Sequence, residues 1–435
     1  MSLAASSART ALIRFGTLAV QIPTSILIAR LLGVEGKGVY TLLTVVPWLI
    51  AFVMLGGLDT AGTWLLSGWR ATLRQIIALD VGILLVSSPL GIMLYLWIAA
   101  PQALAGVPAP LVHASALLIP LVLCRFLLFA ILLGRERVVP FNLLYLVTSL
   151  LVLVLLTVIV GFLGAGTGGA IWAFIGAQAL VLPLAAWWIP WRGSRPQRTA
   201  TEPLSGARFL GKSLAYGLKG HLAGLLVTFN QRFDIFLLGA LAGAREVGLY
   251  AVAVAVAETV WHVPISIQLN LFPRVSAIGA GEGALKMPRA CRMTLLLTLI
   301  LAVAIAVAGR PAISLLFGRD FLPAYMSLLA LLPGVVAVSL AGVFESYFAG
   351  VDKRQYQSVS VGIAFTAGLL LCLLLIPRYG ALGAAVASSV SYALQMVISL
   401  SLYARLAGFS PREFFIPRRE DLAALATLAK DLFRS

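Results

Sequence analysis

The sequence has few charged residues and few cysteines. Only 11% of its 435 residues are charged and 61% are hydrophobic, which excludes an ordinary water-soluble globule. The three cysteines, Cys124, Cys291 and Cys372, are far apart, so they suggest neither a disulfide framework nor a zinc site. The polar connections are too short to form a separate soluble domain. We therefore expect a membrane protein that needs no metal and no other cofactor.

Apolar runs long enough to cross a bilayer recur from one end of the chain to the other. They predict an all-α polytopic membrane protein with about twelve transmembrane helices. The first run lacks a clear cleavage site, so we interpret it as a retained helix. The runs fall at roughly residues 9–32, 38–60, 74–99, 110–133, 140–162, 168–190, 214–239, 247–271, 291–309, 325–349, 356–376 and 382–404.

Basic residues are distributed unevenly between the two predicted sides of the membrane. With the N-terminus placed in the cytoplasm, 22 of the 32 lysines and arginines fall in cytoplasmic segments and six in exterior ones. Cytoplasmic loops of membrane proteins carry such an excess, so both termini are predicted to be cytoplasmic. The net charge of +16 is then explained by topology and attraction to anionic lipid, without nucleic-acid binding.

A 16-residue stretch of the chain is repeated 210 residues later, where Leu238–Ala253 matches Ile28–Leu43. The repeat predicts two pseudo-symmetric six-helix lobes, residues 1–191 and 214–406, with a cavity between them. A basic cytoplasmic linker, 192–213, joins them, and an amphipathic cytoplasmic tail, 407–435, follows. The identical pairs are Leu31 and Leu241, Gly33 and Gly243, Gly38 and Gly248, and Tyr40 and Tyr250.

Two glycine motifs match nucleotide-binding patterns by coincidence. Gly206–Ser213, GARFLGKS, fits the phosphate-loop spacing, but a polar linker precedes it where the motif needs a strand. Gly164–Gly169 fits the dinucleotide spacing, but it follows an apolar run that is too long for a strand. Neither motif indicates a nucleotide site.

Four basic residues lie inside the predicted spans, where charge is costly and therefore points to function. Arg14, Arg125, Lys219 and Arg232 are our candidates for binding an anionic substrate. Arginine suits phosphate oxygens because its planar fork can form two hydrogen bonds. For Arg14 the alternative is extension to the cytoplasmic surface, and for Arg125 it is a structural salt bridge. Arg232 can bind an anion, a structural carboxylate such as Glu258, or each in turn.

The acidic and imidazole groups in the spans are candidates for coupling to an ion gradient. Glu258 and His262 are four residues apart, a spacing that brings two side chains together on one helical face. Such a pair can exchange protons near neutral pH, although a packed and neutralised pair is the alternative. Asp234 and Glu345 complete the set of candidates. The ion is predicted to be a proton or sodium.

Several segments resemble a known family. LLGVEGKGVY after the first span, Arg232–Ala253, LFPRVS at Leu271–Ser276 and IPRYGALGAAVASSVSYAL at Ile376–Leu394 resemble the polysaccharide transporters of the multidrug/oligosaccharidyl-lipid/polysaccharide flippase superfamily. The resemblance implies two six-helix lobes around a basic cavity. It also implies transfer of undecaprenyl-diphosphate-linked sugar repeat units between membrane leaflets. The four basic candidates would then line the cavity and hold the diphosphate.

The expected function is that of a flippase in the bacterial inner membrane, working by alternating access in O-antigen, capsule or exopolysaccharide assembly. Its expected partners are the lipid-linked oligosaccharide, membrane lipids, a proton or sodium ion, and polysaccharide assembly proteins. A drug or cation antiporter, a lipid II flippase and a transport-dead scaffold remain alternatives. A membrane enzyme is not expected, because the exterior loops are too short to hold a catalytic site.

Overall fold

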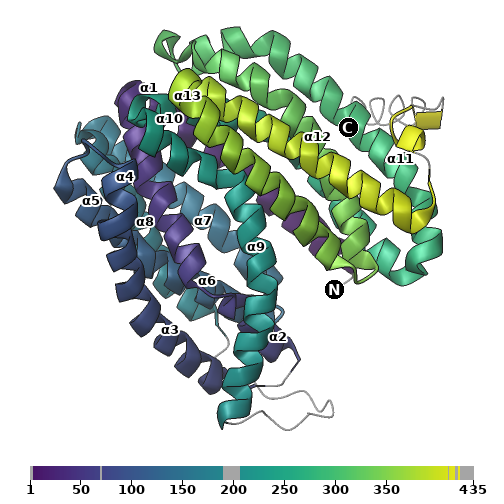
Figure 1. Ribbon diagram of the computed structural model, residues 1–435. Coiled ribbons are helices and arrows are strands. Elements are labelled where there is room, and N and C mark those ends of the chain that lie inside the picture. Colours follow the sequence, from purple (N-terminus) through teal and green to yellow (C-terminus); the bar gives the residue numbers. More distant parts are fainter. Residues whose placement is uncertain (1–2, 69–70, 190–205, 410, 417–419, 422–435) are drawn as a thin grey trace. The chain divides into compact units, whose positions relative to one another are not determined.

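The computed structural model describes residues 3–68, 71–189, 206–409, 411–416 and 420–421. All regular secondary structure in these ranges is helical, which confirms the predicted all-α class. The helices of Figure 1 are α1 (Leu3–Met54), α2 (Leu58–Ser67), α3 (Leu73–Leu94), η1 (Tyr95–Ala99), α4 (Ala100–Ala103), α5 (Ala109–Ala116), α6 (Leu118–Gly134), α7 (Val138–Leu156), η2 (Thr157–Phe162), α8 (Gly166–Trp188), α9 (Gly206–Ala242), α10 (Ala244–Ala257), η3 (Glu258–Trp261), α11 (His262–Leu316), η4 (Arg319–Phe321), α12 (Ala324–Gly350), α13 (Arg354–Ala407) and η5 (Pro411–Phe414).

In the described ranges, nine helical stretches are long and apolar enough to cross a membrane. The first, Ile13–Met54, has 42 residues and would be about 63 Å long if straight, roughly twice the thickness of the hydrocarbon core. Gly33 interrupts it with φ 69°, and Gly380 interrupts α13 with φ 52°. Each of these two helices therefore supplies two crossings. The nine stretches thus give eleven crossings in the described ranges, and α10 with the start of α11 adds one more. The total agrees with the predicted number of about twelve.

The connections between several helices differ from the predicted ones. The break between the first two runs is confined to Gly33, so Lys37 lies inside the second helical segment and not in an exterior turn. The second run ends at Met54, before a turn at Gly56 and Gly57. Residues 274–292 were predicted as a cytoplasmic connection, but they continue α11. Helix patterns alone do not reveal where a helix continues past the bilayer.

The chain divides into two compact units. Unit 1 comprises Met1–Thr228 and Ile235–Ala251, and unit 2 comprises Phe229–Asp234 and Val252–Ser435. Most of α9 therefore belongs to unit 1, while one of its turns belongs to unit 2. The predicted six-helix lobes, 1–191 and 214–406, stay a prediction from the internal repeat. In the predicted linker, residues 206–213 form the start of α9, so the phosphate-loop pattern lies in helix; residues 192–205 lie outside the described ranges.

One core cluster of unit 1 lies between α2, α3, α6, α7, α8 and the start of α9. Leu65, Leu132 and Leu144 are fully buried there, and Phe129 packs edge-on against Phe141 with ring centroids 5.6 Å apart. Thr72 begins α3 with a capping box, in which its hydroxyl accepts from the backbone N–H of Gln75.

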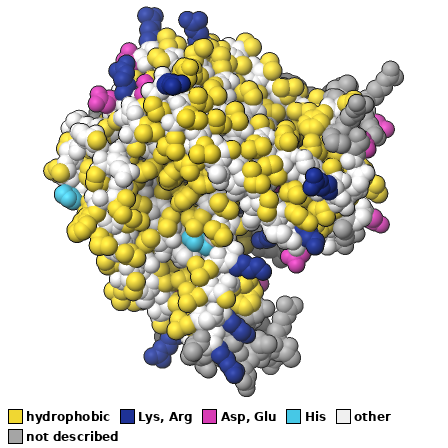
Figure 2. Space-filling model, viewed as in Figure 1, with side chains coloured by type: hydrophobic (Ala, Val, Ile, Leu, Met, Phe, Trp, Pro, Cys, Tyr) yellow, Lys and Arg dark blue, Asp and Glu magenta, His cyan; other side chains and the backbone are white. Residues whose placement is uncertain are grey.

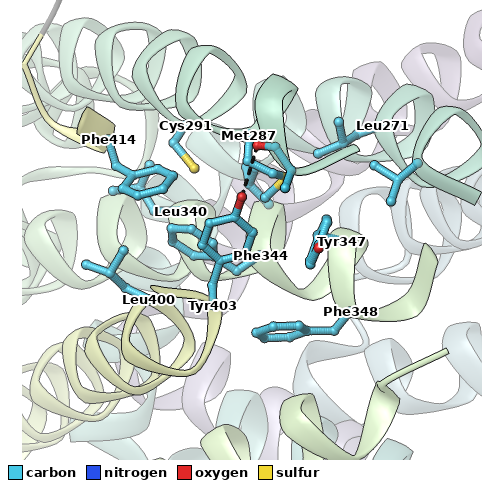
Figure 3. Packing of buried hydrophobic residues seen from close by; sticks show 13 residues of the cluster. Leu271, Met287, Cys291, Leu340, Phe344, Tyr347, Phe348, Leu400, Tyr403 and Phe414 are labelled. Carbon is cyan, nitrogen blue, oxygen red and sulfur yellow. Dashed lines mark hydrogen bonds between the residues drawn. The ribbon is translucent and has the colours of Figure 1, made fainter. Parts of the chain in front are cut away.

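Unit 2 has its core between α11, α12 and α13, which lie side by side in Figure 1. Figure 3 shows aromatic side chains from α12 and α13 at its centre, where Tyr403 donates a hydrogen bond of 3.0 Å to the carbonyl of Ala284. Phe414, from the segment after α13, is only 1% exposed, and its ring centroid is 5.5 Å from that of Tyr403. The tail therefore contributes to the core. The predicted amphipathic part of the tail, from Leu422 on, lies outside the described residues.

Large apolar side chains cover much of the surface. Hydrophobic atoms dominate the face shown in Figure 2. Phe162, Trp187 and Val307 are 77–81% exposed, which would be unfavourable in water. In a bilayer these side chains face lipid, and tryptophan prefers the interface between lipid and water. The surface thus supports a multi-pass membrane protein.

Candidate functional site

In unit 2, Arg232 of α9 forms a two-pronged ion pair with Glu258 at the start of η3. Its Nη1 lies 2.7 Å from Oε1 and its Nη2 donates to Oε2 at 3.1 Å. The side chains remain 30% and 24% exposed, respectively. The two Nη groups that bind the carboxylate could bind two phosphate oxygens in the same geometry. The structure therefore confirms Glu258 as a partner of Arg232, one of the two partners predicted.

Two residues before and two residues after Arg232, Asn230 and Asp234 connect α9 to the second half of α13. Ser388 donates a hydrogen bond of 2.9 Å to Asp234, and Ser391 donates one of 2.7 Å to the side-chain oxygen of Asn230. The amide of Asn230 donates to Gln395 at 3.0 Å. All five side chains are at least nine-tenths buried. Their hydrogen bonds satisfy polar groups that would otherwise be costly to bury.

Glu345 of α12 extends this network. Its two carboxylate oxygens accept hydrogen bonds from Gln395 at 2.6 Å and from Gln357 at 2.9 Å. No cation pairs with Glu345 among the described residues; amide groups alone hold its carboxylate. A carboxylate in that setting can take up a proton without losing an ion pair. We call the set Asn230, Asp234, Glu345, Gln357, Ser388, Ser391 and Gln395 the polar network.

Two of the three predicted basic residues of unit 1 bind neutral partners. Arg14 donates a hydrogen bond of 3.2 Å to Asn142 of α7. Arg125 of α6 donates one of 2.9 Å to the buried Gln178 of α8. Neither forms an ion pair among the described residues, so the salt bridge proposed as the alternative for Arg125 is not found there. Lys219 is exposed on α9. Positive charge that is not balanced by a carboxylate remains available to an anionic ligand.

The predicted pair of Glu258 and His262 is only partly described. Glu258 to Trp261 form a 3-10 turn before α11 begins, so the regular α-helical spacing assumed for the pair does not hold. The side chain of His262 lies outside the part of the chain that the structure describes. Glu258 faces Arg232 instead.

Most members of the polar network were not predicted from the sequence. Ser388, Ser391 and Gln395 follow one another at spacings of three and four residues, which places them on one face of α13. This spacing in an otherwise apolar span was the available signal. Gln357 gave no such signal, because it stands alone near the start of α13.

Solved structures share the fold of this chain. Over 93% of this chain and 88% of the other, the fold matches a lipid II flippase MurJ in an inward closed conformation, with a TM-score of 0.74 and 13% identity. It also matches an inward-facing multidrug resistance MATE family transporter, with a TM-score of 0.61 and 15% identity over 91% and 97% of the two chains. The chain therefore has the same fold as these two proteins.

Sequence comparison narrows the class to a family. The family model for polysaccharide biosynthesis proteins matches residues 27–326, and the chain belongs to that family. The model for lipid II flippase MurJ matches residues 239–430. A Shigella flexneri protein named "Putative O-antigen transporter" is 23% identical over 89% of this chain and 94% of its own length. A Haloferax volcanii protein named "Probable flippase AglR" is 26% identical over 38% of this chain and 36% of its own length.

Proposed function

We propose that this protein is a flippase that moves undecaprenyl-diphosphate-linked oligosaccharide repeat units across the bacterial inner membrane. The product would serve O-antigen, capsule or exopolysaccharide assembly. Family membership and the relative named as an O-antigen transporter support the class of cargo. The flippase and transporter folds support alternating access as the mechanism. Both termini are proposed to be cytoplasmic.

The observation that carries this proposal is the fork between Arg232 and Glu258. The pair is partly exposed, so an incoming diphosphate can reach the guanidinium and replace the carboxylate on it. Arg14, Arg125 and Lys219 are proposed to complete the basic path for the diphosphate. The lipid tail would remain in the bilayer while the sugar and diphosphate cross.

Ion coupling is proposed to act through the acidic groups of unit 2. Displacement of Glu258 from Arg232 would leave a carboxylate without its cationic partner, and we propose this group as one site of coupling to a proton or a sodium ion. Asp234 and Glu345, held by hydroxyl and amide donors, would respond to the same ion. His262 is retained as a proposed coupling residue on the sequence argument alone.

The alternatives differ in the cargo that they predict. A drug or cation antiporter would use carboxylates in its binding path and would not need Arg232. A lipid II flippase would prefer the peptide-bearing precursor, and the match of residues 239–430 to that family keeps this candidate open. A transport-dead scaffold would bind assembly proteins and move nothing.

The test is a vesicle assay with a fluorescent polyprenyl-diphosphate sugar, in which wild type is compared with Arg232→Ala. Arg310→Ala is the matched control, because Arg310 is an exposed arginine of the same unit. We expect flipping by wild type and the control, and at least about a tenfold loss in Arg232→Ala, as expected for a charge-assisted contact of about 1.4 kcal/mol or more. Absence of flipping by folded wild-type protein, with or without an ion gradient, would refute the function. Full activity of Arg232→Ala would leave the function intact and assign Arg232 to structure.

A further inference from the structure

The two copies of the repeated turn pack against each other within unit 1. A Cβ placed on Gly38 would overlap the carbonyl oxygen of Ala244, and one placed on Gly248 would overlap that of Val34. Ala244 is the repeat equivalent of Val34, just as Gly248 is that of Gly38. The contact is therefore reciprocal, and glycine on both sides lets the two backbones meet. We call it the glycine contact.

The two copies also share their local conformation. Gly33 and Gly243 both have positive φ, at 69° and 83°. Tyr40 and Tyr250, seven residues after these glycines, are both buried. The two copies thus match in backbone conformation and burial at these positions, so a change of residue type at a position buried in both copies is not required by the local fold.

Lys37 is such a difference. It is 6% exposed, while its repeat equivalent, Val247, is fully buried at 0%. An apolar side chain satisfies this position in the second copy, so folding of the turn does not require a lysine. Burying an ammonium group costs several kcal/mol more than burying a valine unless a partner compensates it.

The compensation available to Lys37 is small. Its Nζ donates one hydrogen bond of 3.1 Å to the hydroxyl of Ser25. It has no ion pair with a carboxylate among the described residues. Ser25 lies on the same stripe of α1 as Arg14. Eleven residues separate Arg14 from Ser25, about 16 Å along a helix, so the two cations lie toward opposite ends of this stripe.

We propose that Lys37, which directly precedes Gly38 of the glycine contact and is buried in this conformation, binds the anionic diphosphate at the exterior end of the transport path. Arg14 would hold the diphosphate near the cytoplasmic end and Lys37 would receive it before release. Parting of the glycine contact would expose Lys37 to the exterior. The inference rests on the proposed function and adds a binding residue to it.

The first test replaces the charge and keeps the length of the side chain. Lys37→Met removes a buried ammonium, so its melting temperature should equal or exceed that of wild type. Flipping of the fluorescent polyprenyl-diphosphate sugar should fall at least about tenfold, and Lys37→Arg should retain more activity than Lys37→Met. Wild-type flipping by Lys37→Met would overturn the proposal. So would a large fall in melting temperature of Lys37→Met, because the lysine would then be structural.

The second test asks whether the glycine contact shields position 37 from the exterior, and it does not depend on transport. Lys37→Cys is placed in a background without Cys124, Cys291 and Cys372, and spheroplasts are treated with a membrane-impermeant maleimide. Adding Gly248→Ala, which the closed contact cannot accommodate, should speed labelling from the exterior about tenfold. Gly82→Ala is the control, because a Cβ at Gly82 meets nothing within 4 Å. Unchanged labelling in Gly248→Ala, or labelling from the cytoplasmic side alone, would overturn the proposal.

The two tests separate this inference from the proposed function. If wild type does not flip the cargo, the function fails while the labelling result still reports on the glycine contact. If wild type flips the cargo and Lys37→Met does so equally well, the function stands and Lys37 is not part of the path.

Discussion

Removing the carboxylate of Asp421 should strongly destabilise unit 2. The Nε of Arg292 in α11 lies 2.6 Å from the Oδ2 of Asp421, and its Nη1 donates to the carbonyl of Glu413 at 2.9 Å. The side chains of the pair are 6% and 1% exposed. Arg292 thus ties the segment after α13 to the body of the unit. Asp421→Asn keeps the size of the side chain and removes its charge.

The magnitude follows from the burial of the pair. Breaking a buried ion pair from one side typically costs about 3–5 kcal/mol, because the remaining charge stays desolvated. Replacement of both partners by apolar residues removes that residual charge, so Arg292→Met with Asp421→Leu should fall within about 1–2 kcal/mol of wild type. Arg292→Met alone and Asp421→Leu alone should therefore each be less stable than the double variant.

The assay uses a native thiol next to the pair. Cys291 is 1% exposed and belongs to the core of unit 2, so a thiol-reactive fluorophore reports its exposure as the protein is heated. With Cys124 and Cys372 replaced by alanine, the melting curve follows this core alone. Asp421→Asn should lower the midpoint by on the order of 10 °C. An unchanged midpoint, or a double variant as unstable as Asp421→Asn, would refute the reasoning.

Two further predictions concern the polar network and the glycine contact. Glu345→Gln removes the one carboxylate that Gln395 and Gln357 hold, so flipping should become independent of an imposed proton or sodium gradient, with the protein still folded; gradient dependence equal to that of wild type would assign Glu345 to structure. Gly248→Ala should lower the free energy of unfolding by about 1–3 kcal/mol through overpacking, while Gly82→Ala should raise it by up to about 1 kcal/mol, and thermal melts showing the same sign for both would contradict the glycine contact.

The helical class and the number of crossings follow from local properties of the sequence. Hydrophobic length reports the crossings directly, because each one must span the same apolar thickness. The positions where helices end are less local. A glycine with positive φ ends the first crossing within one residue at Gly33, whereas α11 continues through the basic residues of 274–292. Basic residues keep a segment out of the lipid but do not end a helix. Composition alone therefore does not show whether a helix ends at such a segment or continues through it.

A contact between residues far apart in the sequence could be predicted only where the charge of one residue limited its possible partners. Arg232 lies deep in an apolar span and few carboxylates lie near it in sequence, so Glu258 could be named as a partner. Asn230 and Gln395 are neutral and 165 residues apart, and many amides would serve equally well in either place. Hydrogen bonds between neutral groups carry too little sequence signal to be assigned without coordinates.

The basic residues illustrate how one composition signal can hide several roles. The distribution of charge predicts only that Arg292 lies on the cytoplasmic side of the membrane and Lys37 on the exterior side. The structure buries both, one against a carboxylate and the other against a hydroxyl. Arg292 has a structural role, because its ion pair with Asp421 holds the segment after α13 against α11. Lys37, which forms no ion pair among the described residues, occupies a position that valine fills in the other copy of the repeat. This departure from internal symmetry favours a role for Lys37 in binding over a role in membrane topology alone.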